Sequence, residues 1–212
     1  MDGFNDLFKA YTEARDTEVV WDKVKLPDAE MIKVYDDLTP VDDSSAKDIL
    51  SKLAVLKLNG GLGTGMGCTG PKSAIEVRED QTFLDLAVQQ IENLNKRYGA
   101  NVELSLMNSF NTHEDTLKII HKYESHQVTV NLFNQSRFPR FYKESKSPCP
   151  KSFNDDKSKW YPPGHGDVYE SLVRSGLVDR FIAEGKEIIF VSNVDNLGEC
   201  CSEVLKEEHL RL

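Results

Sequence analysis

The feature that most constrains this chain is a short apolar segment that leads directly into a loop dense in glycine. Residues 53–58 (Leu-Ala-Val-Leu-Lys-Leu) are typical of a buried strand, and six of the sixteen residues from Leu58 to Ser73 are glycine. Glycine lets the backbone approach a ligand closely, and successive backbone N–H groups can together hold an anion. Lys72 adds a point charge for phosphate oxygens. The segment therefore predicts an anion-binding loop. A flexible surface loop is less favoured, because such loops are usually rich in serine.

Fragments of this loop match three general nucleotide-binding patterns, but each match fails in its context. Residues 65–70 have the G-x-G-x-x-G spacing of a dinucleotide-binding turn, yet Pro71 and a β-like segment at 74–77 follow where a helix is required. Pro71 also occupies the place where a P-loop needs glycine. A kinase glycine loop would need His-Arg-Asp and Asp-Phe-Gly motifs, and the sequence contains neither. The fragments alone identify no class of nucleotide-binding protein.

The complete string is far more specific than its fragments. Residues 58–67 (Leu-Asn-Gly-Gly-Leu-Gly-Thr-Gly-Met-Gly), followed by Gly-Pro-Lys-Ser at 70–73, resemble the signature of the eukaryotic UTP–glucose-1-phosphate uridylyltransferases, also called UDP-glucose pyrophosphorylases. Later segments support the resemblance in the family's order: Asn108-Ser-Phe-Asn-Thr-His113, Asn134-Gln-Ser-Arg-Phe-Pro139, Tyr161-Pro-Pro-Gly-His-Gly-Asp167 and Val191-Ser-Asn-Val-Asp-Asn-Leu-Gly198. The resemblance covers most of the chain, and we expect it to end after Gly198.

The composition is that of an ordinary globular protein and argues against several functional classes. The chain has 212 residues, of which 39% are hydrophobic and 29% charged, as expected for one domain or one domain with an appendage. Its net charge of −9 argues against general nucleic-acid binding, and no apolar run has the length of a membrane helix. The N-terminus has no signal-peptide pattern. The four cysteines are Cys68, Cys149, Cys200 and Cys201, and their spacing is not that of a metal site. We therefore expect a reducing, cytoplasmic location.

Three regions are predicted along the chain. Residues 1–47 are acidic and form an N-terminal helical extension, with an amphipathic helix whose apolar face carries Phe4, Leu7, Phe8 and Tyr11. Residues 48–198 form the nucleotide-binding part of a catalytic domain. Residues 199–212 are a divergent tail that includes a short acidic helix.

The middle region alternates strand and helix patterns, which predicts an α/β fold with a doubly wound, mostly parallel sheet. The resemblance implies the Rossmann-like fold of nucleotide-diphospho-sugar transferases, truncated in this chain. The predicted strands are 53–58, 102–107, 128–133 and 188–191, the last apolar on both faces. The predicted helices begin at Thr82 with a capping box, at Asn111, at Asp167 and at Leu177. Gly99 ends the first helix, a glycine likewise closes each of the last two, and the polar segment 139–160 is predicted to be a surface loop or lid.

In such sheets, ligands bind beyond the carboxyl ends of the strands. The glycine loop follows the first predicted strand, Asn108 the second, Gln135 the third and Asp195 the fourth. We therefore expect these residues to meet at one edge of the sheet. Asp195 could bind a metal or cap the next element, and Mg²⁺ is favoured because it usually takes one or two carboxylates plus substrate phosphates.

The resemblance implies roles for residues at this edge. Lys72 and Asp195 are implied as catalytic residues, with Asp195 also holding Mg²⁺. Gln135 is implied to face the imide edge of uracil, with Gly164 near the base, while His165 contacts the sugar phosphate. The full implied binding set is Leu58, Asn59, Gly60, Gly61, Lys72, Gln135, Gly164, His165, Asn193, Val194 and Asp195. A structural role is predicted for the remaining histidines, His113, His121, His126 and His209, and residues 111–113 could equally form a helix cap.

The implied activity is the reaction of UTP with glucose 1-phosphate to give UDP-glucose and pyrophosphate, a step of glycogen and nucleotide-sugar metabolism. The nucleophile is already an anion, so catalysis should rest on positioning and charge neutralisation. Family members are much longer and supply a second essential lysine and a β-helical domain. The alternative is therefore a truncated, non-catalytic UTP-binding module, or a partner of a full-length relative, with little turnover of its own. We expect neither nucleic acid nor a membrane as a partner.

Overall fold

The computed structural model describes residues 2–13, 19–32, 34–37, 39 and 41–198. The chain divides into two compact units, Met1–Thr39 and Pro40–Leu212. The acidic helix predicted within residues 199–212, together with Cys200, Cys201 and His209, lies outside the described residues. None of the helices in the described ranges is both long and apolar enough to cross a membrane.

The first unit contains the predicted amphipathic helix, α1 (Asp2–Glu13). The rings of Phe4 and Phe8 stack on its surface with their centroids 5.7 Å apart. Leu7 and Tyr11, from the same predicted apolar face, are more than half exposed, at 57% and 53%. Three short 3-10 turns follow: η1 (Trp21–Lys23), η2 (Ala29–Met31) and η3 (Tyr35–Asp37).

The second unit is built on a four-stranded sheet in the order β5-β4-β1-β8, and every pairing in it is parallel. The strands are β1 (Leu53–Leu58), β4 (Glu103–Asn108), β5 (Val130–Asn134) and β8 (Ile188–Asn193). Each predicted strand is present; β1 has the predicted bounds, and the ends of the others differ from the predicted ones by at most two residues. β8 runs to Asn193 because its ladder with β1 continues to Leu58.

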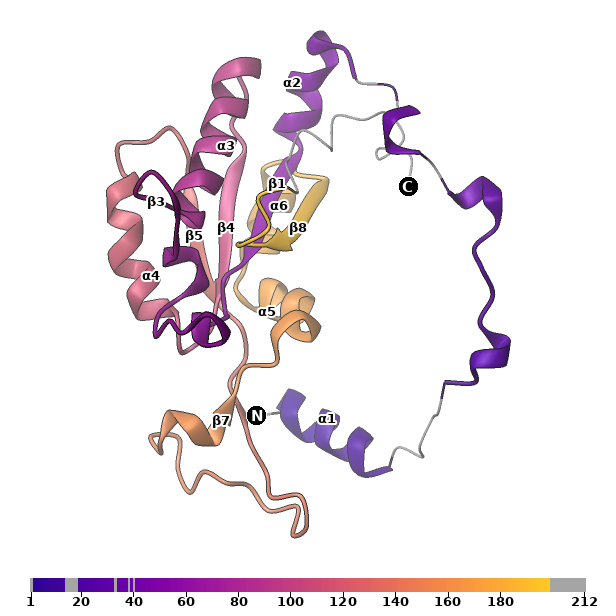
Figure 1. The fold of residues 1–212 in the computed structure, drawn as a ribbon, viewed down its shortest axis with the longest axis vertical. Helices are drawn as coiled ribbons and strands as arrows, with labels where there is room; N and C mark the ends of the chain where they lie inside the picture. The colour runs from indigo at the N-terminus through magenta and orange to yellow at the C-terminus, as the bar shows by residue number, and fades with distance from the viewer. Residues whose placement is uncertain (1, 14–18, 33, 38, 40, 199–212) are drawn as a thin grey trace. The chain divides into compact units, whose positions relative to one another are not determined.

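Helices cover both faces of this sheet, which confirms the doubly wound fold (Figure 1). On one face lie α2 (Asp43–Ser51), α3 (Phe83–Tyr98) and α4 (His113–Ile120), the last followed by the turn η6 (His121–Tyr123). Their buried side chains pack on those of β1 and β4. On the other face, α5 (Val168–Arg174) and α6 (Leu177–Ala183) pack on Leu56, Met107 and Phe133.

The ends of α3 are those that the sequence predicts. The Thr82 side chain accepts from the backbone N–H of Asp85, and the Asp85 side chain accepts from that of Thr82, which is a complete capping box. Gly99 ends the helix in the left-handed conformation, with φ 61°. α5 and α6 are likewise followed by glycines with positive φ, Gly176 and Gly185.

Two predictions about local structure were incomplete. The N-cap of α4 is Thr112, one residue after Asn111 and within the residues 111–113 given as a possible cap; the Thr112 hydroxyl does not cap the helix but accepts from Ser109 N–H and donates to the Asn59 carbonyl. The β-like segment after the glycine loop forms an unpredicted hairpin of β2 (Glu76–Arg78) and β3 (Gln81–Thr82).

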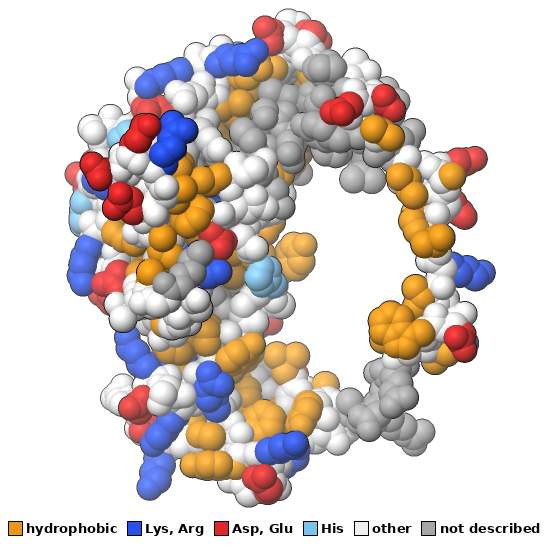
Figure 2. Space-filling model, in the orientation of Figure 1, with side chains coloured by type: hydrophobic (Ala, Val, Ile, Leu, Met, Phe, Trp, Pro, Cys, Tyr) orange, Lys and Arg blue, Asp and Glu red, His pale blue; other side chains and the backbone are white. Residues whose placement is uncertain are grey.

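The segment predicted to be a surface loop or lid is anchored at its base. β6 (Phe138–Pro139) pairs antiparallel with β7 (Trp160–Tyr161), preceded by the turn η7 (Lys157–Lys159). The Arg137 guanidinium lies over the rings of Phe110, Phe153 and Trp160, at 5.0, 4.8 and 4.3 Å from their centroids. Most of residues 140–159 is exposed, and Figure 2 shows Lys and Arg side chains gathered over this part of the surface.

Candidate functional site

A cavity of about 270 Å³ opens at the carboxyl ends of the parallel strands. Every residue of the predicted binding set except Asn59 lines it. Met107, at the end of β4, and Pro162 line it as well and were not predicted. Both lie within segments that the sequence had singled out, but nothing in the sequence showed that these two residues would line the cavity.

The glycine loop folds back on itself and so brings Lys72 to the end of β1. Lys72 N–H donates to the Gly61 carbonyl at 3.1 Å, Gly63 N–H donates to the Gly70 carbonyl at 3.0 Å, and Leu62 bridges Pro71. The loop contains the 3-10 turns η4 (Gly63–Met66) and η5 (Lys72–Ala74). Only its two ends, around Gly60–Gly61 and Lys72, line the cavity.

Asn59 does not line the cavity, and its backbone N–H donates to the Met107 carbonyl at 2.8 Å. Its side chain is 1% exposed, and its Nδ2 donates to Asn108 Oδ1 at 2.7 Å and to Thr116 Oγ1 at 3.0 Å. Thr112 donates its hydroxyl to the Asn59 carbonyl at 2.8 Å. Asn59 therefore fastens the start of the loop to α4, and its pairing with polar residues far along the chain could not be read from the local sequence.

Gln135 is 6% exposed and holds one defined orientation at the cavity wall. Its Oε1 accepts from the Gly164 N–H at 2.6 Å. Because a backbone N–H can only donate, the amide oxygen must face Gly164, and Nε2 then faces Gly60. A Cβ on Gly60 would lie 2.1 Å from that Nε2. Gly164 has φ +73°, a conformation that favours glycine.

On the opposite wall, β8 supplies a second set of polar groups. His165 Nε2 lies 2.9 Å from Asn193 Oδ1, which joins the turn η8 (Gly164–Asp167) to the end of β8. Val194 is 2% exposed, and its N–H donates to the Leu58 carbonyl at 3.2 Å. The other described histidines lie elsewhere: His113 contacts Asn108, His121 contacts Glu124 and His126 contacts Glu92.

Asp195 is the single carboxylate among the residues that line the cavity. Its Oδ2 lies 3.2 Å from Lys72 Nζ, and the two side chains are 29% and 40% exposed. The next two residues hold this carboxylate in place, since Lys57 Nζ donates to the Asn196 carbonyl at 3.2 Å and Gln90 Nε2 to that of Leu197 at 3.1 Å. Lys57 is 2% exposed, and its place in an otherwise apolar strand was a signal that sequence reasoning missed.

The described residues contain no group of three or more His, Cys, Asp or Glu side chains that could hold a metal by themselves. One partly exposed carboxylate at the cavity still fits Mg²⁺, which commonly takes one or two protein carboxylates and completes its shell with phosphate oxygens and water. The donor set of this cavity is therefore compatible with a Mg²⁺–nucleotide and unlike that of a closed all-protein metal site.

Comparison with known proteins gives consistent matches along the chain. The sequence model of the UTP–glucose-1-phosphate uridylyltransferase family matches residues 1–208, past Gly198, where the resemblance was expected to end. A probable UTP–glucose-1-phosphate uridylyltransferase of Schizosaccharomyces pombe is 55% identical over 93% of this chain and 39% of its own length. The Saccharomyces cerevisiae protein of that name is 52% identical over 93% of this chain and 40% of its own.

Solved structures give the same relationship. UDP-glucose pyrophosphorylase of Leishmania major superposes with a TM-score of 0.81 at 28% identity, over 98% of this chain and 43% of that one. Its S374F mutant in complex with UDP-glucose gives 0.79 at 28% identity, over 99% and 43%. The chain thus spans about two-fifths of the length of these relatives. With the family model matching nearly the whole sequence, the chain belongs to the UTP–glucose-1-phosphate uridylyltransferase family.

Proposed function

We propose that this chain carries the UTP-binding part of a UTP–glucose-1-phosphate uridylyltransferase. The observation that carries the proposal is the convergence of Gly60–Gly61, Lys72, Gln135, His165 and Asp195 on one cavity at the carboxyl edge of a parallel sheet. These residues come from separate segments, and a chance gathering of motifs would not place them around one space. A Leishmania major relative binds UDP-glucose, which supports a nucleotide sugar as product.

Uracil would be read by the Gln135 amide. Its Nε2 can donate to a carbonyl of the base, and the second lone pair of Oε1 can accept the N3–H. The bond from Gly164 to the first lone pair supports this role, because it holds the amide in the one orientation that presents this pattern.

The phosphates would lie between the glycine segment and the Lys72 ammonium. Gly60 and Gly61 have no side chains to keep a phosphate from their backbone, and Lys72 supplies positive charge. Asp195 would hold Mg²⁺, which neutralises phosphate charge when bound. His165 and Asn193 would contact the sugar phosphate from the opposite wall.

In the proposed reaction, a phosphate oxygen of glucose 1-phosphate forms a bond to the α-phosphorus of UTP as the bond to the bridging oxygen of pyrophosphate breaks. The nucleophile is already an anion, so no residue needs to remove a proton. The residues act by aligning the two phosphates and by neutralising charge on the oxygens, and these effects commonly account for much of the rate in phosphoryl-transfer sites.

The second candidate is a module that binds UTP without turnover or associates with a full-length relative. It is favoured by the edge strand β8, where the apolar side chains of Ile189 and Val191 remain 39% and 37% exposed in the described structure. An unpaired edge of this kind is a surface for further strands or for another chain.

Two measurements on the full chain test the proposal. UTP with Mg²⁺ should raise the unfolding temperature more than ATP does, because Gln135 is proposed to recognise uracil. A ligand that binds only the native state stabilises it by about 2.7 kcal/mol when its concentration is about 100 times Kd. Pyrophosphate release from UTP and glucose 1-phosphate, with a full-length relative as the positive control, then separates the candidates. Stabilisation by UTP without release supports the binding module, and equal stabilisation by ATP and UTP refutes uracil recognition.

A further inference from the structure

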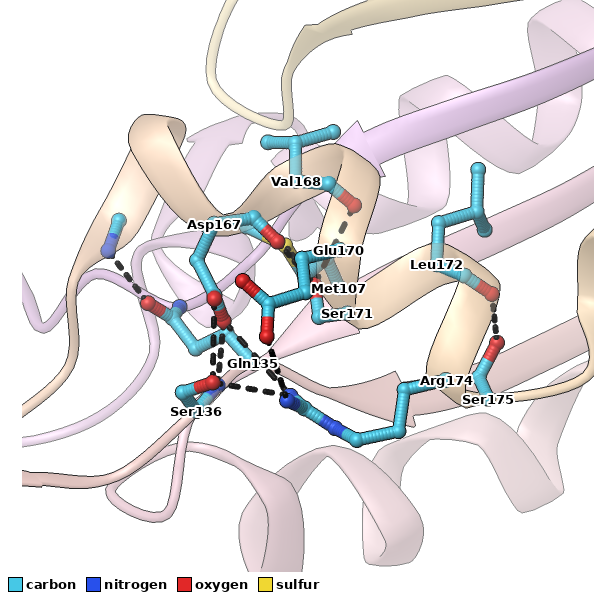
Figure 3. Close-up of polar contacts among 11 residues, drawn as sticks. Met107, Gln135, Ser136, Asp167, Val168, Glu170, Ser171, Leu172, Arg174 and Ser175 are labelled. Carbon is cyan, nitrogen blue, oxygen red and sulfur yellow. Dashed lines mark hydrogen bonds and ion pairs between the residues drawn. The ribbon is translucent and has the colours of Figure 1, made fainter. Parts of the chain in front are cut away.

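The segment between β5 and α5 leaves the sheet and returns to it through a buried polar junction. Ser136 lies at its start and Asp167 at its end, 31 positions apart. Asp167 is 4% exposed, and its carboxylate accepts from the Ser136 backbone N–H at 2.6 Å and from the Ser136 hydroxyl at 3.0 Å (Figure 3). The two ends of the segment are therefore joined through one carboxylate.

Arg174 completes the junction from the end of α5. Its guanidinium donates to the Ser136 hydroxyl at 2.9 Å and lies 3.8 Å from the Asp167 carboxylate (Figure 3). A buried carboxylate is costly unless it is hydrogen-bonded and near a positive charge, and Asp167 has both kinds of partner.

Asp167 does not have the role that its position would ordinarily give it. It stands at the N-cap of α5, where aspartate usually accepts from the backbone of its own helix, yet it makes no side-chain cap bond. Its carboxylate points instead to Ser136, across the segment (Figure 3). A cap on α5 therefore does not explain this buried carboxylate.

The junction lies directly beside the contact that orients the candidate base-reading residue. Gln135 precedes Ser136, and Gly164 begins the turn that Asp167 ends, so the bonds Gln135–Gly164 and Ser136–Asp167 are adjacent links between the same two backbone segments. The turn is also held by a residue of α5. Ser171 donates to the Asp167 carbonyl at 2.6 Å and lies 3.5 Å from the sulfur of Met107, which lines the cavity.

Fixing the Gln135 amide has a consequence for base selection. Uracil presents an N3–H donor and an O4 acceptor, whereas cytosine presents an N3 acceptor and an N4 donor. For a base that the cavity holds in one position, an amide with its oxygen toward Gly164 matches only one of these patterns, while an amide free to turn over could match either.

We infer that Asp167 is a positioning residue that sets the preference of this cavity for uracil over cytosine. By joining Ser136 to the turn at 164–167, it keeps the Gly164 N–H where it holds the Gln135 oxygen. The inference rests on the proposed role of Gln135 in reading the base, and Asp167 itself does not line the cavity.

The test is the ratio of UTP to CTP affinity, measured with Mg²⁺ by titration calorimetry on the full chain. In Asp167→Asn the side chain keeps its shape but loses the charge and one acceptor. We expect UTP to bind more weakly and the UTP-to-CTP ratio to fall about threefold to tenfold, the range for one or two hydrogen bonds. A general loss of stability would weaken both nucleotides alike and leave the ratio unchanged.

Asp155→Asn is the matched control. Asp155 lies in the same segment between β5 and α5, which we call the β5–α5 excursion. Its carboxylate accepts from the Lys151 backbone N–H at 2.8 Å and pairs with Lys159 at 2.9 Å, but Asp155 does not line the cavity. Its substitution should leave the ratio as in the parent chain. An equal fall in this control would show general loosening of the excursion and overturn the inference.

The outcomes separate the inference from the function on which it rests. If a folded Asp167→Asn chain has the same ratio of UTP to CTP affinity as the parent chain, the inference is overturned while uracil recognition by Gln135 stands. A parent chain with no preference for UTP refutes both. If Asp167→Asn does not fold, Arg174→Gln keeps the carboxylate and removes its cation, and the ratio should fall in the same direction by a smaller factor. An unchanged ratio in that variant refutes the inference.

Discussion

The Lys72 ammonium lies 3.2 Å from a carboxylate oxygen of Asp195, although the two residues are 123 positions apart in the sequence. The proposed function assigns these groups to different partners, phosphate for Lys72 and Mg²⁺ for Asp195. Partly exposed ion pairs contribute little to stability, so this one can separate at low cost when a Mg²⁺–nucleotide supplies the opposite charge to each side chain. The ion pair thus keeps both charged groups at the cavity, where each can exchange its partner for a group of the Mg²⁺–nucleotide.

Replacing Lys72 with alanine should weaken UTP binding and leave the fold intact, because the side chain is 40% exposed. Hydrogen bonds to charged groups contribute about 1.5–3 kcal/mol, so we expect affinity to fall roughly ten- to a hundredfold by titration calorimetry. The control is Lys143→Ala, which removes an exposed lysine from the loop between β6 and β7. Unchanged affinity in a folded Lys72→Ala chain would make Lys72 an ordinary surface lysine.

Replacing Asp195 with asparagine should uncouple nucleotide binding from Mg²⁺. In the parent chain, we expect removal of Mg²⁺ by a chelator to reduce the thermal stabilisation by UTP, because the metal joins the carboxylate to the phosphates. In Asp195→Asn the chelator should have much less effect. If UTP stabilises the variant and the parent chain with the same Mg²⁺ dependence, the metal is bound by the nucleotide alone and Asp195 is not its ligand.

Replacing Gly60 with alanine should impair base recognition more than folding. The new Cβ would lie 2.1 Å from Gln135 Nε2, so the Gln135 side chain would have to swing away and give up its bond to Gly164. Gly65→Ala is a matched control in the same loop, since a Cβ there meets nothing within 4 Å. We expect UTP affinity, measured by calorimetry, to fall only in the Gly60 variant. An equal loss in both variants would point to the loop backbone rather than to Gln135.

Asp85 should make stability depend on pH at the acid end. Burial alone would raise its pKa, but hydrogen bonds from Lys122, Thr82 and Tyr123 outweigh that effect and hold the pKa at about 2, below the usual 3.8. The folded state therefore binds the proton less readily than the unfolded state, and the stabilisation present above pH 4 is lost as the pH falls toward 2. Burial and the same carboxylate raise the pKa of the Tyr123 hydroxyl, which donates to Asp85 at 2.8 Å.

Denaturant unfolding between pH 7 and pH 3 measures this contribution. Asp85→Asn should be less stable than the parent chain at pH 7, and the difference should shrink as the pH falls. Asp48→Asn, which changes an exposed carboxylate on α2, should lose stability with falling pH as steeply as the parent chain does. A difference between Asp85→Asn and the parent chain that stays constant across this range would contradict the assignment.

Local chemistry let the sequence alone predict the four strands of the main sheet and the helices α3, α4, α5 and α6 that pack on it. The apolar segment 53–58, the Thr82–Asp85 capping box and the glycines after α3, α5 and α6 depend on neighbouring residues, and each is present as predicted. The alternation of strands and helices was sufficient for the parallel sheet. Strands of one direction end at one edge, so the motifs that follow them could be expected near each other before the strand order was known.

Only the tertiary structure decided which way each polar side chain turns. Asn59 stands within the most specific motif of the chain, yet its side-chain amide is held by Asn108 and Thr116, and it does not line the cavity. Asp167 begins a helix predicted from the sequence, yet its carboxylate joins Ser136 and not the backbone of that helix. A polar side chain buried in a core goes where its hydrogen bonds can be satisfied, and those partners come from segments that only the fold brings together.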